Sequence, residues 1–173
     1  MPVRFAKLLL LSAVALFYTL VILNNTTDFN SNYQFVRHVL MMDTTFPGNK
    51  GMWRAIDSPV WHLVFYISII GWETLTMCLS WWGVYRLSRA LRRPAREFND
   101  AKQIGIIALT LGMLMWLVAF ITVGGEWFLM WQSHTWNGQE AAFRMFVMVG
   151  IVLLLLLQPD LGETAGVDDL APH

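Results

Sequence analysis

Four long apolar stretches restrict what this chain can fold into more than any other feature of its sequence. They cover residues 5–23, 60–84, 104–123 and 141–158. A transmembrane helix needs about 20 mostly apolar residues to cross a hydrocarbon core of about 30 Å, and each stretch meets or approaches that length. Because a bilayer offers no water to unpaired backbone groups, helices are the usual way across it. We therefore expect an all-α, four-helix transmembrane bundle, with the third helix extending to about residue 132.

The composition excludes several other classes of protein. Of the 173 residues, 56% are hydrophobic and 14% are charged, whereas about 25% are charged in an average soluble domain. Twelve Lys and Arg are balanced by twelve Asp and Glu, so the chain lacks the basic surplus that nucleic-acid binding needs. We expect a multi-pass protein whose main partner is the lipid bilayer, with no role for nucleic acid.

The distribution of basic residues along the chain predicts its orientation. Most of them lie around the start of the first stretch or between the second and the third, namely Arg4, Lys7, Arg86, Arg89, Arg92, Arg93, Arg96 and Lys102. The opposite side receives only Arg37, Lys50, Arg54 and Arg144. Since cytoplasmic loops carry the excess of Lys and Arg, we expect both termini to be cytoplasmic, in the inner membrane of a bacterium. Residues 1–158 then form one membrane domain, and 159–173 form an acidic, disordered cytoplasmic tail.

Two of these segments have alternative interpretations. The first stretch has no small-residue cleavage pattern after it, so we interpret it as a retained anchor rather than a cleaved signal peptide. The basic stretch 86–96 is interpreted mainly as an orientation signal. Binding of anionic lipid head groups is its alternative role.

The loops on the predicted outer side are expected to form a structured outer cap from residues 24–59 and 124–140. Tryptophans favour the membrane–water interface, and four of them are predicted to form an aromatic platform there: Trp53, Trp127, Trp131 and Trp136. We expect the turn at 43–49 to pack against the end of the third helix.

Glu73 is the candidate functional residue within the membrane. It lies about 20 Å along the second helix from Val60, near the bilayer centre, where an ionisable group is costly and often functional. Helical periodicity places a polar stripe on its face: His62, Tyr66, Glu73, Thr76 and Ser80. Desolvation at this depth favours the neutral carboxyl. This stripe has two interpretations. In the functional one, it is a proton path or the wall of a quinone or lipid pocket. In the structural one, its side chains form interhelical hydrogen bonds that hold the bundle together.

A second group of polar residues falls on the predicted outer side, and consists of His38, Asp43, Glu126, His134 and Arg144. Glu126 and Arg144 are placed to pair between the third and fourth helices. Imidazoles of His38, His62 and His134 would suit zinc or copper, but they follow no ligand-spaced motif. Separate hydrogen-bonding roles are the favoured interpretation, with a metal site as the alternative.

Several motifs together resemble a bacterial family of predicted small integral membrane proteins that is classed only as a domain of unknown function. They are the segments 42–49 (MDTTFPGN), 53–56 (WRAI), 71–73 (GWE), 124–133 (GGEWFLMWQS) and 136–139 (WNGQ). The resemblance covers about residues 5–158. It implies a four-span inner-membrane protein, and it implies no activity, substrate or catalytic residue.

These observations lead to two hypotheses of function. No phosphate loop, nucleophile elbow or kinase signature is present, so the first hypothesis is a non-enzymatic accessory or scaffold subunit of a larger membrane assembly, a respiratory complex being one candidate. It would associate with other membrane subunits or with copies of itself. The alternative is a small redox, quinone- or lipid-binding, or proton-coupled transport protein that uses His62, Tyr66 and Glu73. No cofactor is predicted; a quinone, lipid or metal belongs to the alternative hypothesis.

Overall fold

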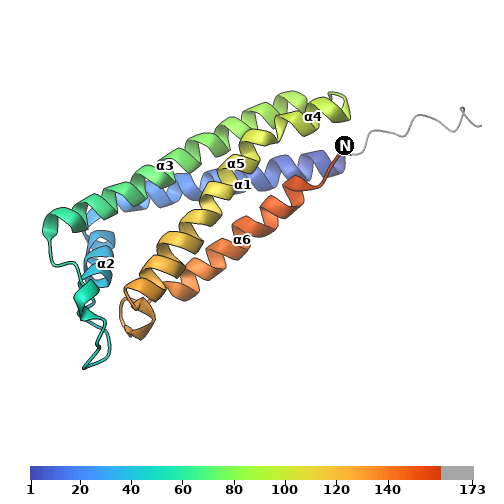
Figure 1. Ribbon diagram of the computed structural model, residues 1–173. Coiled ribbons are helices and arrows are strands. Elements are labelled where there is room, and N and C mark those ends of the chain that lie inside the picture. Colours follow the sequence, from blue (N-terminus) through green and yellow to red (C-terminus); the bar gives the residue numbers. More distant parts are fainter. Residues whose placement is uncertain (161–173) are drawn as a thin grey trace, which may run out of the picture.

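The computed structural model describes residues 1–160, which form helices joined by short turns (Figure 1). Four helical segments are long and apolar enough to cross a membrane: α1 (Pro2–Thr27), α3 (Pro59–Ala90), the segment Ala95–Trp127, and α6 (Gln139–Leu157). No strand occurs in this part of the chain. The prediction of an all-α bundle with four spans is therefore confirmed. Most of the tail predicted for 159–173 lies outside the described residues.

The third span is built from three helical pieces and ends earlier than predicted. A short α4 (Ala95–Ala101) leads into α5 (Gln103–Leu114), which continues to Trp127 as the wider helix η2 (Met115–Trp127). The widening is visible where the backbone N–H of Phe128 reaches back five residues to the carbonyl of Val123, at 3.0 Å. The expected extension to residue 132 is wrong. The helix stops because Leu129 is left-handed (φ 54°), and only a short turn, η3 (Met130–Gln132), follows.

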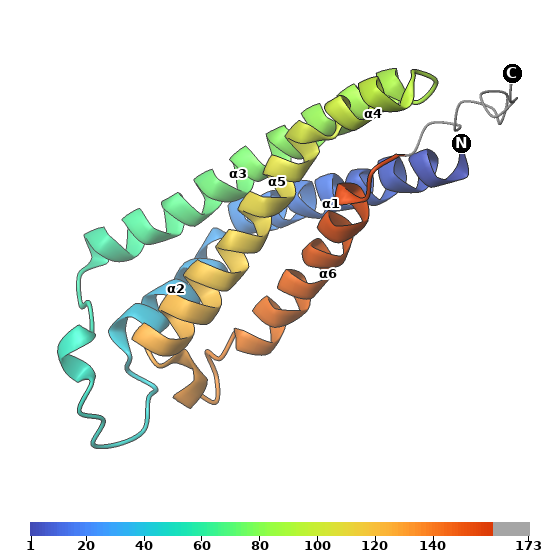
Figure 2. The same cartoon turned by 45° about the vertical axis from the view of Figure 1, so that its right-hand side comes forward.

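An additional amphipathic helix occupies the first long loop. After the single non-helical residue Asp28, α2 (Phe29–Met41) turns away from α1 and packs against α3 (Figures 1 and 2). Its buried side chains are Val36 and Leu40. The loop then passes through a short turn, η1 (Met52–Arg54), before α3 begins. This helix thus forms part of the loop 24–59 that is predicted to contribute to the outer cap.

The helices meet closely at one end of the bundle and separate toward the other, where α2 lies (Figures 1 and 2). At the closed end α3 and α5 come into backbone contact, since a β-carbon added to Gly83 would lie 2.9 Å from the backbone of Gly105. Leu11 of α1 and Leu156 of α6 flank the same point. Small residues allow this approach between membrane helices, so the two glycines set where the bundle is narrowest.

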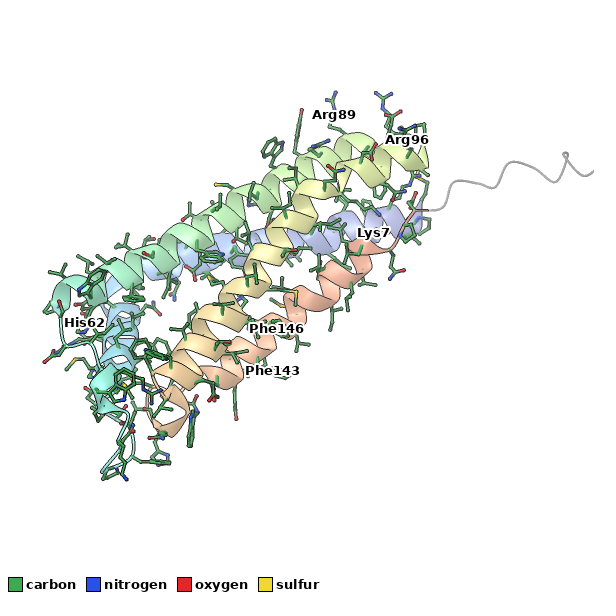
Figure 3. All side chains as sticks on the ribbon, in the orientation of Figure 1. Lys7, His62, Arg89, Arg96, Phe143 and Phe146 are labelled. Atoms are coloured by element: carbon green, nitrogen blue, oxygen red, sulfur yellow. The ribbon has the colours of Figure 1, made fainter. Side chains whose placement is uncertain are left out.

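Two buried lysines bind the carboxyl end of α6 at this closed end. The Nζ atoms of Lys7 and Lys102 donate to the backbone carbonyl of Gln158 at 2.5 and 2.8 Å (Figure 3 labels Lys7). Both residues are almost inaccessible, at 5% and 3% exposure. The last carbonyls of a helix lack partners and carry partial negative charge. The two ammonium groups therefore neutralise a helix end that would otherwise be unpaired.

Arg4 performs the same role for the carboxyl end of α3 and also joins the two ends of the described chain. Its Nη1 donates to the carbonyl of Leu91, the C-cap residue of α3, at 3.1 Å and to that of Arg93 beyond it at 2.6 Å. Its Nε donates to the carboxylate of Asp160 at 2.6 Å. The backbone N–H of Asp160 in turn donates to Asn99 Oδ1 at 2.9 Å. Asp160 thus contacts the bundle, although it lies two residues beyond the predicted domain boundary at 158.

We predict that Gly83→Ala destabilises the protein whereas Gly71→Ala does not. The methyl group at Gly83 would collide with the backbone of Gly105, whereas nothing lies within 4 Å of the corresponding position at Gly71 on the same helix. Overpacking of this kind costs about 1–3 kcal/mol, which exceeds the gain in helix propensity of about 1 kcal/mol. Thermal unfolding in mild detergent measures the difference, and equal midpoints for the two variants would contradict the close crossing.

Candidate functional site

The inward face of α3 carries polar side chains along most of its length. All five residues of the predicted stripe are buried, namely His62, Tyr66, Glu73, Thr76 and Ser80, followed on the same face by Gly83, Leu87 and Ala90. Trp61, Trp72, Trp81 and Trp82 occupy the exposed sides of the same helix. In a membrane span the apolar face meets lipid and polar groups turn inward. This polar face therefore supplies the candidate site of the protein.

Glu73 is paired with an asparagine on α1 that the sequence did not single out. Its Oε2 accepts a hydrogen bond from Asn25 Nδ2 at 2.7 Å, and Tyr66 Oη donates to the backbone carbonyl of Asn25 at 2.8 Å. Glu73 is only 2% exposed. The amide donor suits the carboxyl in either protonation state, because a carboxyl oxygen accepts in both. Asn25, Tyr66 and Glu73 together form the polar cluster.

The remaining members of the stripe do not extend this cluster into a chain. Thr76 and Ser80 donate to carbonyls of their own helix, those of Trp72 (2.9 Å) and Thr76 (2.7 Å). His62, at the start of α3 (Figure 3), donates from Nε2 to the carbonyl of Ile56 at 2.7 Å, since a carbonyl only accepts. Its buried Nδ1 has no partner among residues 1–160. In the described chain, Tyr66 and Glu73 are linked through Asn25, and no side-chain hydrogen bond links this cluster to His62, Thr76 or Ser80.

Tryptophan side chains supply further hydrogen bonds between helices. Trp116 Nε1 donates to Tyr18 Oη at 3.1 Å, and both side chains are buried. Trp81 Nε1 donates to Thr19 Oγ1 at 3.0 Å, and Trp72 Nε1 donates to the carbonyl of Leu111 at 3.0 Å. These bonds link α1 with α3, α1 with η2, and α3 with α5. Part of the structural role expected of the stripe is therefore carried by tryptophans.

A cavity of about 240 Å³ adjoins the polar cluster. Asn25, Asn32, Tyr66 and Glu73 are its polar lining residues. The rest of its lining is apolar or aromatic: Val21, Phe35, Val36, Ile69, Trp116, Phe120, Gly138, Ala141 and Ala142. Within the described residues no hydrogen bond reaches Glu73 Oε1. Glu73 thus lines this cavity and has one carboxyl oxygen without a hydrogen-bond partner in the described part of the chain.

A second cavity of about 230 Å³ lies next to the first and is lined by apolar residues. The two cavities share the side chains of Phe35, Val36, Ile69 and Phe120 as walls. Phe35 and Phe120 stack on each other, with ring centroids 6.4 Å apart. Residues of α2 line both cavities; the first has polar residues in its lining, and the second is lined by apolar residues.

The predicted outer-side cluster of polar residues is only partly assembled. His38 Nδ1 donates to Asp43 Oδ2 at 2.6 Å, and the His38 ring stacks on Trp136 with centroids 4.7 Å apart. His134 is exposed. Within residues 1–160 no three His, Cys, Asp or Glu side chains lie close enough to hold a metal ion. The three histidines considered as metal ligands are therefore not brought together.

The expected pairing of Glu126 with Arg144 is absent from the ion pairs of the described chain. Both side chains are exposed, and Arg54 is the residue that approaches Glu126, at 3.5 Å from its backbone carbonyl. The physical reason lies in η2. In a wider helix, each residue is rotated about the axis by less than in an α-helix. The direction of the Glu126 side chain that α-helical spacing predicts is therefore wrong, because Glu126 lies near the end of η2.

The loop segments beyond α2 and η2 contact each other. Thr44 Oγ1 donates to Ser133 Oγ at 2.8 Å, and the backbone N–H of Phe46 donates to Gln132 Oε1 at 3.1 Å. The Phe46 ring meets Trp131 edge to face, with centroids 5.7 Å apart. These contacts bring the turn at 43–49 against the chain that follows the third span.

The aromatic platform is divided into separate parts. Trp53 and Trp127 meet edge to face at 5.8 Å, with the guanidinium of Arg54 5.5 Å from the Trp127 ring. Trp131 instead contacts Phe46, and Trp136 contacts His38 and Phe35. The four tryptophans predicted to form one surface thus belong to three different contacts.

We predict that Asn25→Ala lowers stability by about 1–2 kcal/mol, because it leaves a buried carboxyl without its donor. Asn24→Ala is the matched control, since Asn24 is exposed and its side chain forms no hydrogen bond with the described residues. Glu73→Gln retains an acceptor oxygen and should change stability by less than Asn25→Ala. Thermal unfolding in detergent compares the three variants, and a loss with Asn24→Ala as large as with Asn25→Ala would remove the special role of this bond.

The comparisons with known proteins agree with this architecture. A family described as predicted small integral membrane protein (DUF2165) matches residues 3–159. No curated protein and no solved structure shows a significant match. Since the match covers nearly the whole chain, the protein belongs to this family of predicted small integral membrane proteins of unknown function.

Proposed function

We propose that this protein binds a neutral lipophilic molecule with a ring-shaped, hydrogen-bonding head, of which a membrane quinone is the type. The observation that carries the proposal is the cavity of about 240 Å³ beside the polar cluster of Asn25, Tyr66 and Glu73. Binding sites for small molecules combine a mostly apolar lining with a few placed polar groups. One carboxyl, two amides and one phenol in a space that is otherwise lined by apolar and aromatic residues match that description.

The lining residues select among possible head groups. Among the described residues no Lys or Arg lines the cavity, and the carboxyl of Glu73 would oppose an anionic head, so a phosphate has no binding partner there. The rings of Phe35, Trp116 and Phe120 provide flat apolar surfaces that suit an aromatic or quinonoid ring. A neutral carboxyl donates a hydrogen bond to a carbonyl, which is the polar group that a quinone carries.

The neighbouring apolar cavity supports a ligand with a hydrocarbon tail. Its lining includes Phe65 of α3 and Val118 of η2, both of which are exposed at the surface of the bundle. A tail lying along this cavity would reach the lipid between these helices. The two adjoining spaces together accommodate a head group and the first part of a tail better than either does alone.

The proposal predicts that a short-chain ubiquinone analogue such as decylubiquinone raises the thermal midpoint of the wild-type protein in mild detergent. A ligand at 100 times its dissociation constant stabilises by about 2.7 kcal/mol, equivalent to about 2–4 °C per kcal/mol for a chain of this size. Glu73→Leu should weaken the effect by removing the head-group contact. Ala141→Phe should abolish it by filling the cavity that Ala141 lines.

Ala13→Phe is the matched control for Ala141→Phe, because Ala13 is also an exposed helical alanine and lines neither cavity. It should leave the stabilisation unchanged. Absence of any shift in the wild-type protein, or a full shift in both Glu73→Leu and Ala141→Phe, would rule out this ligand class at this site.

A second function, that of an accessory or scaffold subunit, is favoured by the aromatic surface at the α2 end. Trp53 is 76% exposed, Trp127 48% and Trp131 44%, and aromatic side chains are enriched where proteins associate. The partner would be another membrane-protein subunit or a second copy of this chain. The bacterial inner membrane with cytoplasmic termini, inferred from the basic residues, is the proposed setting of either function.

Native mass spectrometry from mild detergent tests this second function. It predicts a complex of fixed stoichiometry that Trp53→Ala combined with Trp127→Ala dissociates, because these variants remove the exposed rings. Trp82→Ala, at the opposite end of α3, is the control and should leave the complex intact. A monomer under all conditions would exclude the scaffold role.

A further inference from the structure

The carboxyl end of α3 extends beyond the hydrocarbon region of a bilayer. Trp61 and Trp82 are both exposed on this helix and lie 21 residues apart, which corresponds to about 31 Å, the thickness of a hydrocarbon core. Tryptophans at such positions mark the two interfaces. Arg86 and Arg89 follow Trp82 by about 6 and 10 Å of helix. Their side chains therefore fall at the level of lipid head groups.

A groove of about 540 Å³ lies at this level between the end of α3 and the returning helix α4. One part of its lining is basic and consists of Arg86, Arg89 and Arg93, while the other part is acidic and consists of Glu97 and Asp100. Tyr85 adds an exposed aromatic ring. Both signs of charge thus line a single groove next to the lipid.

The arginines of the groove have unused hydrogen-bonding capacity. Within the described residues, Arg86 and Arg89 form no side-chain hydrogen bond and no ion pair, and Arg93 approaches Glu97 only at 4.0 Å. Arginine presents a planar fork of donors that matches a phosphate bidentately. Surface arginines can satisfy these donors with water, but here they converge on a groove that also borders the lipid.

We propose that this groove binds the head group of phosphatidylethanolamine, with the phosphate on Arg86 and Arg89 and the ammonium group on Glu97 and Asp100. The membrane itself supplies this ligand at the depth where the groove lies. The acidic residues decide between lipids. They repel a purely anionic head group, and they provide acceptors for an ammonium group that carries hydrogen-bond donors.

The mixed lining changes how the basic stretch 86–96 is interpreted. A cluster of Lys and Arg beside a membrane ordinarily indicates anionic lipid, and the sequence alone offers that alternative. The fold brings Glu97 and Asp100 of α4 to the same groove as Arg86 and Arg89. Phosphatidylcholine also carries a phosphate and a positive charge, but its trimethylated nitrogen donates no hydrogen bond, so it should bind more weakly.

Lipid titration by native mass spectrometry tests the proposal on the full chain in mild detergent, with phosphatidylethanolamine, phosphatidylglycerol and phosphatidylcholine of the same acyl chains. The wild-type protein should retain phosphatidylethanolamine most strongly. Arg86→Gln combined with Arg89→Gln should weaken its binding by about tenfold or more, as expected for the loss of charge-assisted hydrogen bonds. Arg92→Gln combined with Arg96→Gln is the matched control, because it removes the same charge from the same segment outside the groove.

A second pair of variants tests the selectivity. Glu97→Gln combined with Asp100→Asn should reverse the preference, so that phosphatidylglycerol binds at least as strongly as phosphatidylethanolamine. This pair is exposed, so it remains informative if the arginine variants fail to fold. Inorganic phosphate in excess should not displace the lipid.

Three results would overturn the proposal. The first is equal weakening by the groove and control arginine pairs, which would indicate general electrostatic attraction. The second is an unchanged lipid preference after Glu97 and Asp100 are neutralised. The third is displacement of the lipid by inorganic phosphate, which would show that the groove recognises the phosphate ion rather than a lipid head group.

Discussion

The backbone contact between Gly83 of α3 and Gly105 of α5 determines the shape of the bundle. Helices that touch through glycines approach more closely than helices separated by side chains, so the four spans are narrowest at this point. From there they diverge toward α2 (Figures 1 and 2). The space beside Glu73 exists because the close contact lies at one end of the helices and not at their middle.

The closed end and the interior of the bundle satisfy their polar groups in different ways. At the closed end, Lys7 and Lys102 bind the carbonyl of Gln158, so cations complete the carboxyl end of a helix. In the interior, the carboxyl of Glu73 accepts a hydrogen bond from the side chain of Asn25. A hydrogen bond of this kind holds α1 and α3 together through one oxygen of Glu73, whose side chain also lines a cavity. A structural role of Glu73 is therefore compatible with the proposed ligand-binding role, because the bond to Asn25 leaves the other oxygen free of partners in the described chain.

Much of the fold and part of the site could be predicted from hydrophobicity and helical periodicity. Four spans follow from their length, and the inward stripe from His62 to Ser80 follows from spacing along one regular helix. Asn25 was missed because the first apolar stretch ends at Leu23, whereas the helix continues to Thr27 and carries the asparagine inward. The pairing of Glu126 with Arg144 failed for a related reason, since the irregular winding of η2 is not encoded in a hydrophobic pattern. The cavities depend on the angles between helices, which no single stretch of sequence specifies.

The ion pair between Arg4 and Asp160 has a consequence for the way the protein is made. The two residues are separated by 156 positions, and at roughly 5–20 residues per second the ribosome needs about 8 s or more to synthesise the chain between them. During that interval the first span is already available for insertion, while the groups that pair with Arg4 and Lys7 at the end of the last span do not yet exist. Until α6 arrives, Lys7 lacks the carbonyl of Gln158 and Arg4 lacks the carboxylate of Asp160. The bundle is thus completed only after α6 has been synthesised, and a chain interrupted before α6 would lack the contacts that close it.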